Sequence, residues 1–276
     1  HWIAAKTRTG AQASTLVRAW KPYFALGMWG YRRNGATEAE QNRDTCTAFA
    51  RHLFNTHMGM GGGYVRTPEG LEMLEELGLK VMISDPMSRD AGHPQLYARF
   101  LMDEPDAHEA NIQDLPGYRR VGSFAQGLVE KRERWMREDP LTPILLNVDL
   151  TYKPENWLTY GQLPDIFALD PYFIGQLCST YWKHPGWLGQ YSHPYYVFAL
   201  SEIARFASQP KPLHVILNAV STQDLENNRA FRYSTPDEKR IEFYYALAAG
   251  AQGISYWWFT PYGECKGCGS DQPEAI

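Results

Sequence analysis

The 276-residue chain lacks several features that would each indicate a particular class of protein. It has no run of about 18 apolar residues, so the sequence predicts no membrane-spanning helix. It has no excess of basic residues, because its formal net charge is -4, and this disfavours a nucleic-acid partner. Internal repeats, low-complexity tracts and linkers rich in Pro, Gly or Ser are also missing. We therefore expect a single domain over residues 1–276, with residues 1–22 as an N-terminal extension.

Cysteine is scarce, with only Cys46, Cys178, Cys265 and Cys268 in the chain. Only the last two form a CxxC pair, and a zinc site would need two further ligands, which no second CxxC or HxxxH supplies. A local disulfide and free thiols are the interpretations we favour over a metal site. We expect neither a bound metal nor a cofactor.

A phosphate-binding fingerprint is also missing. No G-x-G-x-x-G follows the first apolar segment, and the glycines at 61–63 are not followed by the Lys-Ser/Thr pair of a P-loop. This disfavours a doubly wound nucleotide-binding sheet, and we interpret the glycines as a loop at the rim of the fold.

Apolar segments that alternate with amphipathic ones are abundant. Eight of them read as strands, and the three at 142–147, 165–170 and 213–218 are nearly continuous apolar runs, which is typical of parallel strands buried on both faces. The eight segments are residues 23–31, 54–60, 80–84, 98–103, 142–147, 165–170, 213–218 and 253–259. Helices are predicted at 37–54, 67–78, 122–139 and 235–250, with capping boxes at Thr37 and Thr235.

Eight strands with helices in most connections predict an α/β fold, the (β/α)8 TIM barrel. The connection from Ser84 to Ala98 is too short for a full helix, and no convincing helix follows Phe259. We therefore expect a barrel that is incomplete at its C-terminal end.

In such a barrel the active site lies at the C-terminal ends of the strands. The predicted ends carry carboxylates, amides and aromatic rings and no cluster of histidines. They are Trp29, Tyr31, Arg32, Arg33, His57, Asp85, Asp103, Glu104, Asn147, Asp149, Asp170, Tyr172, Asn218, Tyr256, Trp257 and Trp258. Such a rim suits glycoside hydrolysis, in which two carboxylic groups act on the glycosidic bond while aromatic rings bind the sugar faces.

The stretch "RFLMDEPD" places three carboxylates where the fourth strand ends. Partial burial and the charge of Asp103 or Asp106 would raise the pKa of Glu104, which suits a general acid. Asp103 is then a neighbour that raises this pKa or contacts sugar, and Asp106 a turn residue. The alternative is that the whole "DEPD" is a solvated turn.

The order of "FLMDEPD", "PILLN", "DIFALDPYFIG", "KPLHVILNAVS" and "TPDEKRIEFYYALAAGAQGISYWWFTP" resembles the TIM-barrel glycoside hydrolases related to clan A. The resemblance runs from Tyr23 to Pro261. In that clan the motif at strand four is Asn-Glu-Pro and its Glu is the acid/base. The resemblance therefore implies this role for Glu104, with Asp103 in place of the Asn that contacts the sugar.

The chain departs from the clan at strand seven, where members carry a nucleophilic Glu and this sequence has Asn218. Our choice for the second carboxylate is Asp170, ahead of Asp149 and Glu264, because it ends a buried strand. Since strands four and six are separated by one strand, we expect their rim groups roughly 6–10 Å apart, closer to the inverting spacing.

Several other residues are candidates for sugar contacts. His57 either binds sugar or is hydrogen-bonded locally. Of Trp257 and Trp258, which alternate along the last strand, one should point into the barrel. Residues 181–196, rich in aromatics, form either a substrate loop or a protein interface. The candidate sugar contacts are Trp29, Tyr31, His57, Asp103, Asn147, Asp149, Tyr172, Asn218, Tyr256 and Trp258. His214 is expected to be structural, and Arg240 to form a surface pair.

These observations favour a secreted or periplasmic glycoside hydrolase that acts on a poly- or oligosaccharide, with Glu104 and Asp170 as its catalytic residues. The alternative is a catalytically inactive carbohydrate-binding barrel, which the missing carboxylate at strand seven supports. A metal-dependent barrel hydrolase would need His and Asp ligands at several strand ends, and only His57 is suitably placed.

Overall fold

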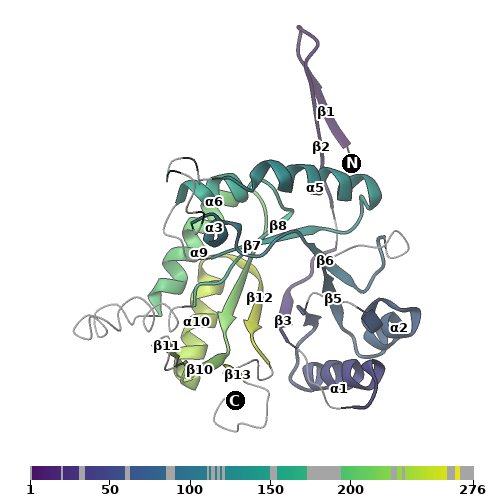
Figure 1. Ribbon diagram of the computed structural model, residues 1–276, viewed down its shortest axis with the longest axis vertical. Coiled ribbons are helices and arrows are strands. Elements are labelled where there is room, and N and C mark those ends of the chain that lie inside the picture. The colour runs from purple at the N-terminus through teal and green to yellow at the C-terminus, as the bar shows by residue number, and fades with distance from the viewer. Residues whose placement is uncertain are drawn as a thin grey trace, which may run out of the picture.

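The computed structural model describes residues 2–19, 21–30, 35–59, 63–84, 91–110, 112, 116, 119, 122–149, 154–172, 194–224, 229–231, 234–259 and 265–267. Eight parallel strands form a closed barrel in the order β12-β3-β4-β5-β6-β7-β8-β9 (Figure 1). They are β3 (Ala25–Met28), β4 (Thr56–His57), β5 (Lys80–Ile83), β6 (Leu96–Phe100), β7 (Ile144–Val148), β8 (Ile166–Leu169), β9 (Leu213–Asn218) and β12 (Ala251–Trp257). Each overlaps one predicted strand, so the predicted barrel is confirmed.

The predicted helices correspond to α1 (Glu38–Arg51), α2 (Pro68–Glu76), α5 (Ala125–Glu138) and α10 (Pro236–Ala248). Both capping boxes form: the side chains of Thr37 and Thr235 accept from the backbone N–H three residues on, and the Glu there accepts from the cap backbone. Arg240 pairs with Asp237 on the exposed face of α10, as expected. None of the described helices is long and apolar enough to cross a membrane.

In the described part of the chain, four further helical segments were not predicted. They are η1 (Gly63–Arg66), α3 (Pro105–Ala110), α6 (Pro154–Tyr160) and α9 (Tyr195–Ser208). The expectation that Tyr195 and Tyr196 belong to a loop is wrong, because they begin α9, while residues 181–193 lie outside the described residues. Helix α9 follows Pro194 without a side-chain cap, so its start carries none of the usual sequence signals.

Two small sheets accompany the barrel. Strands β1 (Trp2–Lys6) and β2 (Gln12–Leu16) form an antiparallel hairpin in the N-terminal segment, and it projects away from the barrel (Figure 1). Strands β11 (Arg229–Phe231), β10 (Val220–Asp224) and β13 (Cys265–Gly267) form a three-stranded sheet beside the end of β9. In the described part of the chain, β12 is followed by β13 and not by a helix.

The structure describes the state of one of the four cysteines, Cys46. Cys46 is a buried free thiol on α1, where burial raises its pKa to about 12. Cys178 and Cys268 lie outside the described residues, so a pair between Cys265 and Cys268 stays a prediction.

Inside the barrel, a chain of hydrogen bonds joins side chains from four strands or their ends. The Tyr97 hydroxyl lies 3.1 Å from His214 Nδ1, and His214 Nε2 lies 2.9 Å from Ser255 Oγ. The indole Nε1 of Trp29 donates to the same Ser255 Oγ at 3.1 Å. His214 is fully buried within this chain, which is the structural role expected for it, and the chain fixes the ring of Trp29 near the C-terminal end.

Candidate active site

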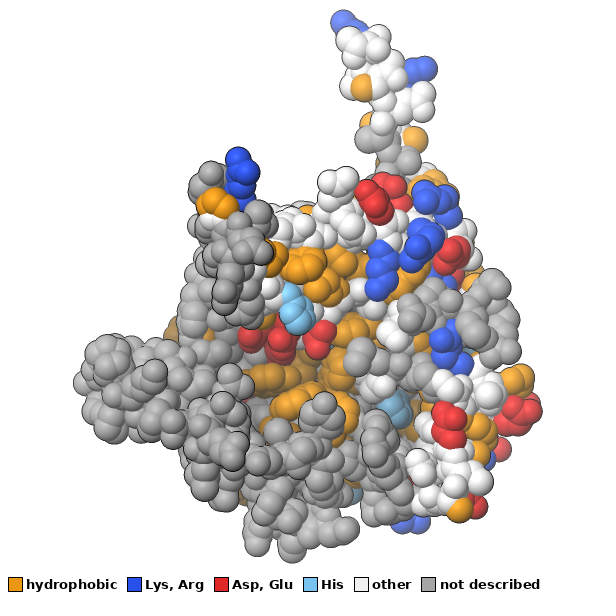
Figure 2. Space-filling model, in the orientation of Figure 1, with side chains coloured by type: hydrophobic (Ala, Val, Ile, Leu, Met, Phe, Trp, Pro, Cys, Tyr) orange, Lys and Arg blue, Asp and Glu red, His pale blue; other side chains and the backbone are white. Residues whose placement is uncertain are grey.

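A pocket of about 210 Å³ opens at the C-terminal ends of the strands, where a barrel of this type carries its site. Carboxylates and aromatic rings line it. The lining residues are Trp29, Asp103, Glu104, Asn147, Asp170, Tyr172, Ile216, Trp257 and Trp258. Figure 2 shows acidic side chains gathered beside hydrophobic ones in a hollow of the face in view. The structure thus brings together seven of the predicted sugar-contact and catalytic positions, with two residues that were not predicted as sugar contacts, Ile216 and Trp257.

Glu104 stands on a tight turn between β6 and α3. Its backbone has φ of 42°, in the left-handed region that non-glycine residues rarely adopt. Its N–H donates to the carbonyl of Asn147 on β7 at 3.0 Å, and Pro105 then begins α3. A residue held in this conformation by a neighbouring strand is typical of a functional position.

Three carboxylates converge at the pocket: Glu104, Asp170 and Asp149. One oxygen from each lies within 4.8 Å of the other two. Glu104 and Asp170 are hydrogen-bonded to each other through their side chains. The expected separation of roughly 6–10 Å between these groups is therefore wrong. Both side chains line the same pocket, so their oxygens approach more closely than the strand ends that carry them.

The electrostatic setting favours protonated carboxyls. Burial, and then the charges of Asp149, Asp103 and Asp106, raise the pKa of Glu104 to about 7, against the opposing effect of its hydrogen bond with Asp170. Burial and the charge of Glu104 raise the pKa of Asp170 well above its ordinary value. Since the two share a hydrogen bond, a proton held between them is the stable arrangement near neutral pH.

Asp103 lies beside this pair. Its Oδ1 accepts a hydrogen bond of 3.0 Å from Nδ2 of Asn147, and burial raises its pKa. Because Nδ2 of Asn147 faces Asp103, Oδ1 of the same Asn147 amide points away from Asp103. Asn147 Oδ1 and Asp170 Oδ1 are both buried, and neither has a hydrogen-bond partner among the described residues.

The interpretation of Asp106 as a turn residue is wrong. It lies in the first turn of α3 with no exposed surface, and both its oxygens accept hydrogen bonds. The backbone N–H of Asp149 donates to Oδ1 and the indole of Trp157 donates to Oδ2, each at 2.9 Å. Asp106 therefore positions the backbone that carries Asp149, and Pro105 directly before it was the available signal for a helix start.

Aromatic rings form the walls of the pocket. The rings of Tyr172 and Trp257 are 5.8 Å apart between centroids, and those of Trp257 and Trp258 are 6.1 Å apart. The expectation that only one of the two tryptophans faces inward is wrong, because both line the pocket. Strand β12 ends at Trp257, so the alternation of a strand does not extend to Trp258.

Three predicted sugar contacts lie away from the pocket. His57 is buried against Phe49 of α1, and its Nδ1 accepts from the N–H of Gly59 at 2.9 Å, which is the local bonding given above as its alternative. Asn218 bonds through its side chain to the backbone of Val220. Tyr256 faces the helices, with Lys239 of α10 over its ring.

The other rim candidates cannot be placed. Tyr31, Arg32, Arg33, Asp85 and Glu264 lie outside the described residues. The alternative second carboxylate, Glu264, therefore stays a prediction.

The three carboxylates are also the group of described residues whose oxygens lie close enough together to hold one metal ion. Oxygen ligands of this kind suit a hard cation such as Ca²⁺ or Mg²⁺. No histidine belongs to the group, unlike the His and Asp set that a metal-dependent barrel hydrolase would need.

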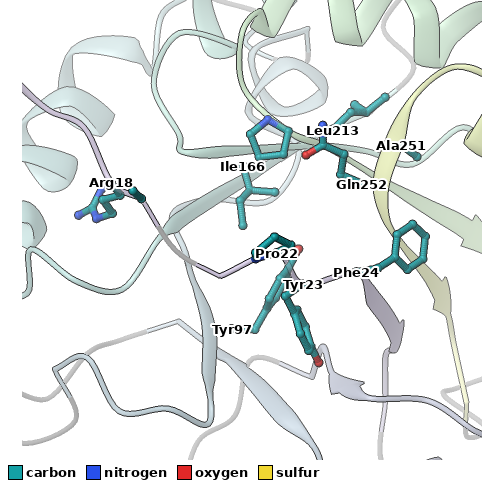
Figure 3. A pocket seen from close by; sticks show the side chains of 11 residues that line it. Arg18, Pro22, Tyr23, Phe24, Tyr97, Ile166, Leu213, Ala251 and Gln252 are labelled. Atoms are coloured by element: carbon teal, nitrogen blue, oxygen red, sulfur yellow. The ribbon is translucent and has the colours of Figure 1, made fainter.

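A second cavity, of about 580 Å³, lies at the opposite end of the barrel (Figure 3). The segment before β3 contributes Pro22, Tyr23 and Phe24, which lie across the strand starts that carry Tyr97 and Ile166. The described lining contains no carboxylate, so this end lacks the groups for glycosidic cleavage.

Comparisons with known proteins agree with this fold. A β-galactosidase from the psychrophilic Marinomonas ef1 is 12% identical with a TM-score of 0.62, and the match covers 91% of this chain and 58% of that one. A β-galactosidase from the Antarctic haloarchaeon Halorubrum lacusprofundi is 13% identical (TM-score 0.59; 85% and 52% covered). An endo-β-1,4-mannanase from Thermotoga petrophila is 13% identical (TM-score 0.53; 92% and 71% covered).

These solved structures are glycoside hydrolases of clan A, the group that the motifs resemble. At identities this low, the similarity establishes the barrel fold. The chain spans about half the length of the two β-galactosidases. No protein-family model matches the chain, and neither does any curated protein.

Proposed function

We propose that the chain is a glycoside hydrolase that cleaves a poly- or oligosaccharide with Glu104 as general acid, and that it is secreted or periplasmic. The observation that carries this proposal is the position of the Glu104 carboxyl. It lies in an aromatic pocket at the C-terminal end of the barrel, hydrogen-bonded to Asp170 and near Asp149. An acid with a pKa near 7 is protonated in about half of the molecules at pH 7, so it can deliver a proton to a leaving oxygen.

The proposed reaction follows from this arrangement. Glu104 gives its proton to the glycosidic oxygen as the bond from that oxygen to the anomeric carbon breaks. The negative charge of the carboxylate cluster stabilises the positive charge that develops on the sugar ring. Water then adds to the anomeric carbon and loses one proton to the cluster. The hydrogen bond between Asp170 and Glu104 is the path by which that proton returns to the acid.

A catalytically inactive carbohydrate-binding barrel is the second candidate. It is favoured by Asn218, which stands at the end of β9 with its side chain bonded to the backbone of Val220 and carries no charge. Against it stands the convergence of Glu104 with two other carboxylates, because a binding pocket for neutral sugar has no need of buried carboxyls with raised pKa values.

The test is Glu104→Gln, assayed on a panel of aryl glycosides and on oligosaccharides. The amide keeps the shape of the side chain but has no proton to give, so we expect kcat to fall about 10²- to 10⁴-fold, the usual contribution of a general acid. Circular dichroism and thermal unfolding should show an intact fold. The matched control is Glu76→Gln, the same change on the exposed side of α2, where Glu76 pairs with Arg43. Turnover by Glu104→Gln within tenfold of the wild type would refute the assignment.

A further inference from the structure

The described lining of the pocket is acidic without a basic counterpart. Asp103, Glu104 and Asp170 face it, and no Lys or Arg is among the nine described residues around it. The charges that affect Glu104 and Asp170 most strongly are all carboxylates. Like charges placed this close together repel one another unless a proton or a cation lies between them.

Two buried oxygens at the pocket also lack a donor. Asn147 is 1% exposed and Asp170 is 2% exposed, and Oδ1 of each is without a hydrogen-bond partner among the described residues. Nδ2 of Asn147 donates to Asp103, so Oδ1 of Asn147 is an acceptor whose orientation is fixed. Buried acceptors in a folded protein are normally satisfied, so a ligand that enters this pocket must bring donors.

From these observations we infer that the pocket binds a sugar unit that carries a free amino group. A protonated amine supplies one positive charge and three donors, which matches a carboxylate cluster with two unpartnered acceptors. The inference rests on the proposed function, since it names the class of substrate for the same site.

The walls of the pocket distinguish this ligand from a metal ion. Four of the nine lining residues are aromatic: Trp29, Tyr172, Trp257 and Trp258. Their rings offer no ligand to Ca²⁺ or Mg²⁺, which take six or more oxygens, but they bind the apolar face of a sugar and attract an ammonium group. The volume of about 210 Å³ is below the range of drug-sized pockets and suits one sugar unit.

The first experiment measures binding by calorimetry or NMR titration at pH 7, where an amino sugar is mostly protonated and the Glu104 carboxyl, with a pKa of about 7, is about half ionised. The probes are glucosamine and galactosamine, with glucose, galactose, their N-acetylated amines and glucuronate for comparison. Free monosaccharides interconvert between anomers, so the unknown anomeric preference does not limit this test. We expect the amino sugars to bind at least tenfold more tightly than the neutral ones, and glucuronate to bind more weakly than any. Equal affinity for amino and neutral sugars would overturn the inference.

A second arm tests the metal ion, with CaCl2, MgCl2 and MnCl2 alone as probes. Millimolar salts should leave the affinity for glucosamine within twofold. Tight metal binding that displaces glucosamine would assign the cluster to a metal instead of an amine.

The variant Asp149→Asn tests whether the charge of one carboxylate determines the preference for an amine. Asp149→Asn removes a negative charge from the cluster and should lower the ratio of glucosamine to glucose affinity at least fivefold. The control Asp237→Asn makes the same change on the exposed surface of α10 and should leave that ratio unaltered. A ratio that does not change in Asp149→Asn would contradict the inference.

The inference and the proposed function fail separately. Amine-selective binding without turnover of any aryl glycoside would support the inference and refute the hydrolase. Turnover of neutral glycosides without a preference for amines would support the hydrolase and refute the inference.

Discussion

Buried carboxylates at the two ends of this barrel have pKa values that are shifted in opposite directions. At the C-terminal end, Glu104 and Asp170 face each other, and burial raises the pKa of both. At the N-terminal end, Asp139 has no exposed side chain but is paired with Arg99 at 2.9 Å. Burial alone would raise its pKa, yet hydrogen bonds from Thr142 and the charge of Arg99 hold the pKa of Asp139 below its usual value.

We propose that the difference separates a structural carboxylate, Asp139, from the two that act in the proposed reaction. Asp139 also accepts from the N–H groups of Leu141 and Thr142, so its hydrogen bonds and its ion pair together outweigh the effect of burial and stabilise the charged form. Around Glu104 and Asp170, the protonated form is favoured and two nearby acceptors have no partner among the described residues. Groups that proteins keep for chemistry are often held in such unfavourable surroundings.

The largest expected effect comes from breaking the structural pair. Arg99→Met leaves the charge of Asp139 buried without its partner, and we expect the free energy of unfolding to fall by about 3–5 kcal/mol. Urea unfolding monitored by circular dichroism measures it. The double variant Arg99→Met/Asp139→Asn, which removes both charges and keeps an oxygen for the N–H groups, should recover a large part of the loss. A double variant no more stable than Arg99→Met would show that the packing of Arg99, and not its charge, is what matters.

A smaller effect, about 1–2 kcal/mol, is expected from pH. The pKa of Glu104 is raised on folding from its ordinary 4.5 to about 7. Its contribution to stability is therefore present in full below pH 4.5 and is lost as the pH rises through about 7. For Asp139 the sign is reversed, because its pKa is lowered, so its contribution is present above its ordinary 3.8 and is lost as the pH falls.

Unfolding of the wild type and of Glu104→Gln between pH 4.5 and 8.5 separates these two contributions. The wild type should lose stability relative to Glu104→Gln on the alkaline side, and the same alkaline limb should reduce glycosidase activity as the acid loses its proton. A stability difference that does not vary over this range would contradict the raised pKa of Glu104.

The sequence allowed the barrel and the position of Glu104 at the pocket to be predicted, because both depend on local patterns. Apolar runs mark each strand, and "DEP" at the end of one of them marks Glu104. The spacing of Glu104 and Asp170 was not predictable, since it depends on how two side chains converge inside a closed barrel. The role of Asp106 was missed for a similar reason, because the fold alone brings its partners Asp149 and Trp157 to it. For His57, the local hydrogen bond with Gly59 was one of the two alternatives that the sequence left open.

The smallest expected change in stability distinguishes the two ends most directly, because Asp170→Asn and Asp139→Asn are the same substitution of a buried carboxylate. Asp170→Asn removes a like charge next to Glu104, so at pH 8 we expect the free energy of unfolding to stay within about 1 kcal/mol of the wild type or to rise. Asp139→Asn leaves Arg99 buried without a partner charge and should lower it clearly. Activity should respond in the reverse order, with kcat lost in Asp170→Asn and nearly unchanged in Asp139→Asn. If Asp170→Asn unfolds the protein as readily as Asp139→Asn, then Asp170 is a structural residue, and the carboxylate that works with Glu104 must be sought at Asp149 or Glu264.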